Sequence, residues 1–154
     1  NSRAMHYLRA GGIDSQLLSF EMTLPQIRDV SKAVPAEVLI YGRLPLMVME
    51  NCVMKNRTGT CSCQTTQTKL IDRMGEEFPI VKDPGTCRNV LLNGKKLYLL
   101  DKKESFRGMG LWALRLQFTT ENAGEVDRVL SEYRSGARFE PGSCTRGLYN
   151  RGVE

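Results

Sequence analysis

The sequence predicts a mixed α/β fold, because strand and helix patterns alternate at both ends of the chain and paired strands are predicted between them. Near the amino end, a strand, a helix and a second strand follow one another, which is the order of a βαβ unit with parallel strands. Near the carboxyl end, another strand precedes a helix. A length of 154 residues is enough for one domain with its own hydrophobic core.

The amino-terminal βαβ unit begins with Leu17–Glu21, an apolar run that predicts a short buried strand ending in a carboxylate. Thr23 is a typical N-cap for the helix that follows. Apolar residues recur at helical spacing as far as Val34, and Pro35 is expected to end the helix. Glu37–Tyr41 is rich in β-branched and aromatic side chains, which predicts the second strand.

The middle of the chain is predicted to form two hairpins after an irregular, polar segment at residues 50–68. The first hairpin turns at Met74-Gly75-Glu76, between two apolar runs. The second turns at Asn93-Gly94, a pair that tolerates the positive φ of a tight hairpin turn. Its two strands are predicted at Val90–Leu92 and Leu97–Leu100.

The last third of the chain returns to strand and helix. Leu111–Phe118 predicts a strand, and Asn122 is a candidate N-cap for an amphipathic helix that Gly136 ends. The remaining stretch, Phe139–Glu154, is rich in Gly and Arg and is predicted to be irregular.

Four of the five cysteines, Cys52, Cys61, Cys63 and Cys87, stand between an apolar strand and the second hairpin. Four converging thiolates can fill a tetrahedral zinc site or hold an iron–sulfur cluster. The spacing lacks the two CxxC pairs of a zinc ribbon and does not choose between these metals. Inert buried thiols and disulfides are the alternatives, although no signal peptide indicates an oxidising compartment. Cys144, far downstream, is interpreted as a bystander.

The charge of the chain permits an anionic partner without requiring one. The formal net charge is +5 and the pI is about 9.1, so RNA is a possible partner. The basic residues are scattered, however, which is also typical of an ordinary solvated surface. No apolar run approaches the ~18 residues of a membrane span. We therefore expect a cytoplasmic protein with no membrane contact.

Hydrolase machinery is poorly represented in the sequence. The only histidine, His6, falls in a predicted helix and is expected to lie at the surface. Glu21 and Asp72, each at a strand end, are candidate catalytic carboxylates, and Arg43 is a candidate clamp for an anionic substrate. Glu21 is as well explained as a charge at the start of the next helix, and Arg43 as an ion-pair partner of a neighbouring glutamate.

Several motifs in chain order resemble the collagenase-like peptidases of unclassified catalytic type, family U-thirty-two. The motifs are Tyr41-Gly42-Arg43-Leu44-Pro45-Leu46-Met47, Glu50-Asn51-Cys52, Cys61-Ser62-Cys63, Asp72-Arg73-Met74-Gly75, Phe78-Pro79, Cys87-Arg88-Asn89, Thr145-Arg146-Gly147 and Arg151-Gly152-Val153-Glu154.

The resemblance implies the later half of a (β/α) barrel with a cysteine-bearing β-hairpin insertion. Residues 1–49 and 101–154 would belong to the barrel and residues 50–100 to the insertion. A chain that opens on Asn1 and lacks the first barrel half is expected to be an inactive fragment of a larger enzyme. Its partners would be the remainder of the parent barrel or, through an open sheet edge, a second copy in a homodimer.

The resemblance also implies a cofactor and a reaction. Relatives bind a 4Fe-4S cluster through four cysteines and support oxygen-independent hydroxylation of RNA bases or of a quinone precursor, which gives Cys52, Cys61, Cys63 and Cys87 the ligand role. The alternative is a peptidase whose cysteines are structural or bind zinc. A third interpretation is a non-enzymatic zinc module that docks a partner.

Overall fold

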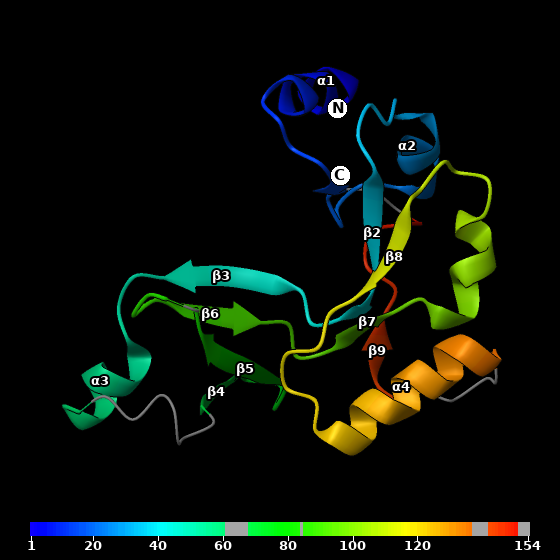
Figure 1. Cartoon of the computed structure of the whole chain (residues 1–154). Coiled ribbons are helices and arrows are strands. Elements are labelled where there is room, and N and C mark those ends of the chain that lie inside the picture. Colours follow the sequence, from blue (N-terminus) through cyan, green and yellow to red (C-terminus); the bar gives the residue numbers. More distant parts are fainter. Residues whose placement is uncertain (61–67, 84, 137–141, 151–154) are drawn as a thin grey trace. The chain divides into compact units, whose positions relative to one another are not determined.

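The computed structural model describes residues 1–60, 68–83, 85–136 and 142–150. The chain divides into two compact units, each described here by itself (Figure 1). The first unit comprises Asn1–Gly42 and Leu97–Glu154, and the second comprises Arg43–Lys96.

The first unit combines short helices with a mixed sheet. Its elements are α1 (Ser2–Ala10), β1 (Gln16–Leu17), α2 (Leu24–Asp29), β2 (Ala36–Gly42), β7 (Lys96–Tyr98), the 3₁₀ helix η1 (Leu100–Phe106), β8 (Ala113–Leu116), α4 (Ala123–Ser135) and β9 (Cys144–Thr145). The second unit contains β3 (Pro45–Met49), α3 (Val53–Thr58), β4 (Thr68–Ile71), β5 (Glu77–Lys82) and β6 (Asn89–Leu92). No helix of the described residues is long and apolar enough to cross a membrane.

Strand β2 is the centre of the first unit's sheet, and all seven of its residues are buried. It pairs in parallel with β1 and with β8, which runs beside it in Figure 1, and antiparallel with β7 at its carboxyl end. Strand β9 continues the sheet beyond β7. The mixed α/β class is therefore confirmed, and the described strands do not close into a barrel.

The core of the first unit contains side chains from helices α1 and α2 and from β2. Ile27 of α2 and Ile40 of β2 are completely buried, and Met5 of α1 is 2% exposed. Burying such a side chain contributes about 1.5–3 kcal/mol relative to leaving it in water. The uninterrupted burial of β2 explains why its sequence reads as a continuous apolar run with a single charge.

The predicted N-caps of helices α2 and α4 are confirmed. Thr23 and Asn122 each accept a hydrogen bond from the backbone N–H three residues on, in complete capping boxes. Gly136 ends α4 with a φ of +69°, in the left-handed region that glycine favours. These signals depend only on residues within one helical turn, so the sequence alone sufficed to identify them.

The predicted bounds of the first strand and first helix are wrong. Strand β1 is only Gln16–Leu17, and Leu17 is 37% exposed rather than buried. Helix α2 ends at Asp29 instead of Val34, because Val30 is already extended with ψ 129°. The Lys32 ammonium donates to the carbonyl oxygens of Ile27 at 2.6 Å and Val30 at 3.1 Å, and so replaces the next helical turn.

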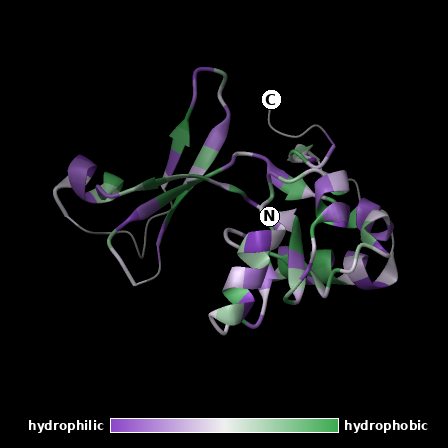
Figure 2. Cartoon of the chain, turned by 90° about the horizontal axis from the view of Figure 1, so that it is seen from above, coloured by the Kyte–Doolittle hydropathy of each residue, from purple (hydrophilic) through white to green (hydrophobic). Residues whose placement is uncertain are grey.

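The second unit is a four-stranded antiparallel sheet in the order β3-β6-β5-β4. The first predicted hairpin is confirmed as β4–β5. The edge strand β3 has apolar side chains exposed on both faces: Leu46, Met47 and Val48 are each more than half exposed. Green segments along the strands of this unit in Figure 2 show the same apolar character.

The second predicted hairpin, at Asn93-Gly94, is wrong. Strand β6 pairs with β3 and β5, whereas β7 joins β2 in the first unit's sheet. Neither turn residue has the positive φ of a tight hairpin. Glycine is required at position 94 for close approach instead, because a Cβ there would lie 2.8 Å from the Glu77 carbonyl oxygen.

The carboxyl-terminal segment, predicted to be irregular, contains β9 and a buried anchor. Tyr149 is 2% exposed, its hydroxyl donates to the Leu39 carbonyl oxygen at 2.7 Å, and its ring meets Phe106 edge to face at 5.9 Å. Gly147 approaches Leu97, since a Cβ there would lie 3.1 Å from the leucine Cδ1. The segment therefore packs against the centre of the first unit's sheet.

Burial raises the pKa of Tyr149 to about 12, which predicts a loss of stability in alkali. Below its ordinary pKa of about 10 the tyrosine is neutral in both states and its contribution is complete. As the pH rises towards 12, the unfolded state loses the proton first, so the free energy of unfolding falls by about 3 kcal/mol. Urea unfolding at pH 9 to 12 measures this, and Tyr149→Phe should show a correspondingly shallower fall. Equal slopes for the two proteins would contradict the assignment.

Candidate functional site

Cys52 lies at the start of α3, in the segment that the sequence predicted to be irregular. It is the N-cap of this short helix, and its Sγ accepts a hydrogen bond from the Lys55 backbone N–H at 3.5 Å. The residue is partly buried, and Gly59 ends the helix with a φ of +73°. The Cys52 sulfur therefore has a fixed direction and one polar partner.

Cys87 lies in the turn that leads from β5 into β6. The Asp83 backbone N–H donates to the Arg88 carbonyl oxygen at 3.0 Å, and the Thr86 hydroxyl donates to the Asp83 carboxylate at 2.9 Å. These bonds define the turn, and Cys87 is exposed on it. An exposed thiol is accessible to a metal or cluster.

The Cys52 and Cys87 segments meet at one end of the β3–β6 pair. Met49 stands opposite Asn89 in the strand register. Asn89 is 3% exposed, and its Oδ1 accepts a hydrogen bond from the Val53 backbone N–H at 2.8 Å. The Arg88 guanidinium also pairs with Glu50 at 2.9 Å. Residues close to Cys52 are thus joined to residues close to Cys87 by a hydrogen bond and an ion pair.

Cys61 and Cys63 lie outside the described residues, so their predicted ligand role is untested by the geometry. The residues before and after them both contact α3. The Thr58 hydroxyl donates to the carbonyl oxygens of Met54 and Thr60, each at 2.9 Å, and the Thr68 hydroxyl donates to the Met54 sulfur. Within the described part of the chain, no three His, Cys, Asp or Glu residues form a group that could hold a metal ion.

Basic side chains accompany the two described cysteines. Lys55 and Arg57 lie in the last turn of α3, and Arg88 directly follows Cys87. Positive charge in the same segments can offset the negative charge of thiolate ligands. The local charge is therefore suited to a centre built from thiolates.

The three candidate catalytic residues are divided between the two units. Glu21 is exposed in the first unit, where its backbone N–H donates to the Ser19 hydroxyl at 3.2 Å. In the second unit, the Asp72 carboxylate accepts backbone N–H bonds across the β4–β5 turn at 2.8 and 2.9 Å. The Arg43 guanidinium donates to the carbonyl oxygens of Asn93, at 2.7 Å, and Gly94. Asp72 and Arg43 thus stabilise turns.

Two polar contacts of the first unit were missed by the sequence reasoning. Glu37, 6% exposed, receives two hydrogen bonds from Arg115 across the β2–β8 pair, at 2.5 and 2.8 Å. A charged residue within an apolar strand was the available signal. The Arg146 guanidinium donates to the Tyr98 carbonyl oxygen at 2.8 Å and to the Asp101 carboxylate at 2.5 Å, and the bond to Asp101 raises the pKa of the guanidinium.

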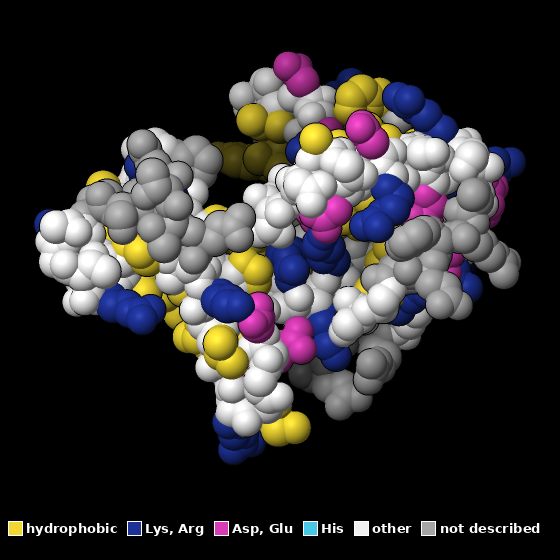
Figure 3. Space-filling model, turned by 90° about the horizontal axis from the view of Figure 1, so that it is seen from below, with side chains coloured by type: hydrophobic (Ala, Val, Ile, Leu, Met, Phe, Trp, Pro, Cys, Tyr) yellow, Lys and Arg dark blue, Asp and Glu magenta, His cyan; other side chains and the backbone are white. Residues whose placement is uncertain are grey.

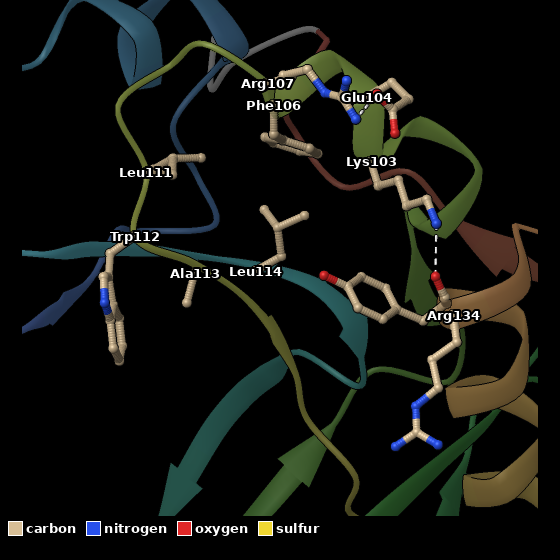
Figure 4. Close-up of a pocket in the computed structure, with 10 residues that line it drawn as sticks. Lys103, Glu104, Phe106, Arg107, Leu111, Trp112, Ala113, Leu114 and Arg134 are labelled. Atoms are coloured by element: carbon tan, nitrogen blue, oxygen red, sulfur yellow. Dashed lines mark hydrogen bonds and ion pairs between the residues drawn. The ribbon is translucent and has the colours of Figure 1, made fainter.

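The first unit also contains a pocket of about 500 Å³ beside β8 (Figure 4). Its walls come from η1, from the residues at the start of β8 and from the last turns of α4. It is lined by Lys103, Glu104, Phe106, Arg107, Leu111, Trp112, Ala113, Leu114, Tyr133 and Arg134. No motif in the sequence indicated it, because its walls are far apart along the chain. His6, as expected, is exposed on α1.

The fold and the cysteines define an α/β protein with a separate antiparallel unit that carries paired cysteine segments. A sequence model of peptidase family U32 matches residues 1–138. The chain therefore belongs to peptidase family U32, as the resemblance of its motifs implied. No curated protein matches the chain, and neither does any solved structure.

Proposed function

We propose that this chain is the cofactor-bearing part of an iron–sulfur enzyme that hydroxylates RNA bases without oxygen. In this proposal Cys52, Cys61, Cys63 and Cys87 hold a 4Fe-4S cluster. The observation that carries it is the direct bonding of the Cys52 and Cys87 segments through Asn89 and through the Glu50–Arg88 ion pair. Thirty-four residues separate these two cysteines in the sequence.

The other two thiols are tied to the same place by the covalent chain. Cys61 directly follows Thr60, which accepts a hydrogen bond from α3, and Cys63 follows two residues later. Consecutive Cα atoms are about 3.8 Å apart. Both thiols thus have only a short chain between them and the helix that begins at Cys52, which supports a shared centre.

The donor set is suited to such a cluster. Four thiolates around a 4Fe-4S core leave a net negative charge, and Lys55 and Arg57 supply positive charge in the same segment, whereas Arg88 is paired with Glu50. The Lys55 backbone N–H already donates to the Cys52 sulfur, as N–H groups do to cluster-ligating sulfurs. When bound, the cluster would supply one-electron transfer, while the surrounding residues orient it and limit the access of water.

We further propose that the parallel run β1–β2–β8 is part of a (β/α) barrel that other segments of a parent protein complete. Parallel pairing and the positions of α2 and α4 after β1 and β8 support this. Among the described strands, β8 pairs only with β2, so its other edge can accept a strand of the parent or of a second copy.

The proposal of an RNA substrate is based on the proposed hydroxylation reaction and on the net charge of the chain. The net charge of +5 favours a polyanion. On the face drawn in Figure 3, the Lys and Arg side chains lie at several separate places, so no single track marks an RNA path there. A thiolate-held cluster needs a reducing compartment, which agrees with a cytoplasmic location.

Metal and sulfide analysis of protein purified and reconstituted without oxygen tests the proposal. We expect about four iron and four sulfide per chain and a brown protein with broad visible absorption. Stoichiometric zinc with no sulfide would contradict the proposal of a cluster.

The family's designation as a peptidase favours a second candidate, a protease with structural or zinc-binding cysteines. That candidate predicts a colourless protein whose parent hydrolyses peptides after iron is removed.

A further inference from the structure

Strand β3 is an outer strand of the second unit's sheet. In the sheet order β3-β6-β5-β4 it stands at one end, and among the described strands it pairs only with β6 (Figure 1). A register shift between Pro45 and Met47 leaves Met47–Met49 as the regular part of the strand. The N–H and C=O groups along such an edge can pair with a further strand. The open edge of β3 is therefore a candidate interaction surface.

The side chains of β3 make this edge apolar. Leu46, Met47 and Val48 are each more than half exposed, and the strand contains no charged residue. The outer strand at the opposite end of the sheet, β4, instead carries Lys69, whose ammonium pairs with Glu77 of β5. Lysine on an outer strand hinders the addition of another strand. The edge of β4 thus has a protection that the edge of β3 lacks.

One side chain of β3 belongs to an apolar row that crosses the sheet. Val48 stands opposite Val90 of β6, which in turn stands opposite Val81 of β5. Val90 and Val81 are partly buried, whereas Val48, at the open end of the row, is 59% exposed. Contacts between cross-strand apolar side chains stabilise paired strands. A further strand beside β3 would therefore continue the row and cover Val48.

The two ends of β3 carry opposite charges. Arg43 lies just before the strand and Glu50 just after it. The Arg43 guanidinium donates to the carbonyl oxygens of Asn93 and Gly94. The side chain of Glu50 is 74% exposed, and ion pairs as exposed as the one it makes with Arg88 contribute little. The segment is thus basic at its amino end, apolar in the middle and acidic at its carboxyl end.

This charge pattern selects an antiparallel copy of the same segment as the complementary neighbour. In an antiparallel pair, the acidic end of each copy lies beside the basic end of the other, so Glu50 of one chain approaches Arg43 of its partner. A parallel pair would place like charges beside each other, which destabilises neighbouring strands.

We propose that β3 pairs antiparallel with β3 of a second copy of this chain and joins the two four-stranded sheets into one continuous sheet. Two copies of one strand that pair antiparallel are related by a two-fold axis, so the contact closes at a dimer. A contact of one strand on each side is smaller than the roughly 1,200–2,000 Å² of stable interfaces. The dimer is therefore expected to be reversible and to depend on concentration.

Sedimentation of the whole chain from micromolar to near-millimolar concentration tests the proposal. A reducing agent keeps the exposed Cys87 from forming disulfide dimers. We expect a monomer–dimer equilibrium without larger species. Val48→Lys should weaken the dimer about tenfold or more, because it places a charge in the apolar edge of both copies. Glu50→Gln should weaken it a few-fold, because it removes the acidic end of the segment.

Ile71→Lys is the matched control. Ile71 lies on β4, at the other end of the same sheet, and is 57% exposed, against 59% for Val48. The same change from a β-branched apolar residue to lysine should there leave the dimer unaffected.

Three results would overturn the proposal. The first is a monomer at every concentration, which would leave a strand of a different protein as the occupant of the edge. The second is a Val48→Lys variant that is folded by circular dichroism and dimerises like the wild type. The third is an equal loss of the dimer in Ile71→Lys. None of these measurements depends on iron, so their failure is distinguishable from a failure of the proposed cluster.

Discussion

Cys87→Ser and Cys52→Ser are each expected to abolish stable cluster binding in protein reconstituted without oxygen. Each change leaves three thiolates where a 4Fe-4S cluster takes four, and a serine hydroxyl is a poor substitute at neutral pH. We expect the iron and sulfide contents to fall from about four per chain to a small residue, with loss of the visible absorption.

Cys144→Ser is the matched control for these variants. Cys144 is a free, partly buried thiol in β9 of the first unit, while the proposed ligands belong to the second. The variant should keep the full iron content. Full iron in both Cys52→Ser and Cys87→Ser would refute the ligand assignment, and so would loss of iron in Cys144→Ser alone. Far-ultraviolet circular dichroism would show whether each variant remains folded.

Gly42→Ala is expected to give the largest loss of stability among single-methyl additions, about 3 kcal/mol or more. Gly42 ends β2 with a φ of +133°, which side-chain-bearing residues rarely adopt. An added Cβ would overlap the carbonyl oxygen of Gln117 and lie 3.2 Å from its carbonyl carbon. Backbone atoms cannot rotate away, so the β2–β8 pair would have to separate there, beside the hydrogen bond from the Gln117 N–H to the Tyr41 carbonyl.

Gly108→Ala separates the backbone strain from the steric overlap. Gly108 also has a positive φ, +78°, but an added Cβ would meet nothing within 4 Å. Its cost should be limited to that of the left-handed conformation, about 1–2 kcal/mol. Urea unfolding of the two variants and the wild type measures the difference. Equal losses for both variants would show that the approach of β2 to Gln117 does not limit stability.

The candidate site was only partly accessible from the sequence. The four clustered cysteines were evident from spacing, and the family followed from the motifs around them. The sequence did not show what joins the Cys52 and Cys87 segments. That connection depends on the β3–β6 register and on a buried Asn89, both of which involve residues about forty positions apart. The pocket beside β8 was inaccessible for the same reason.

Features that depend on neighbouring residues could be predicted from the sequence. The caps at Thr23 and Asn122, the end of α4 at Gly136 and the β4–β5 turn all follow from hydrogen bonds or dihedral preferences within about one turn of chain. The strand at β2 followed from its composition.

The pairing of the strands and the end of α2 depend on contacts between distant segments and were not predictable from local sequence. Asn93-Gly94 looks like a hairpin turn locally, yet β6 finds its partners in β3 and β5 and β7 finds its partner in β2. Helix α2 could continue by propensity, yet Lys32 satisfies its last carbonyl groups. Strand partners and helix ends are set by burial and hydrogen bonding between distant segments, which outweigh local preferences of about 1 kcal/mol or less per residue.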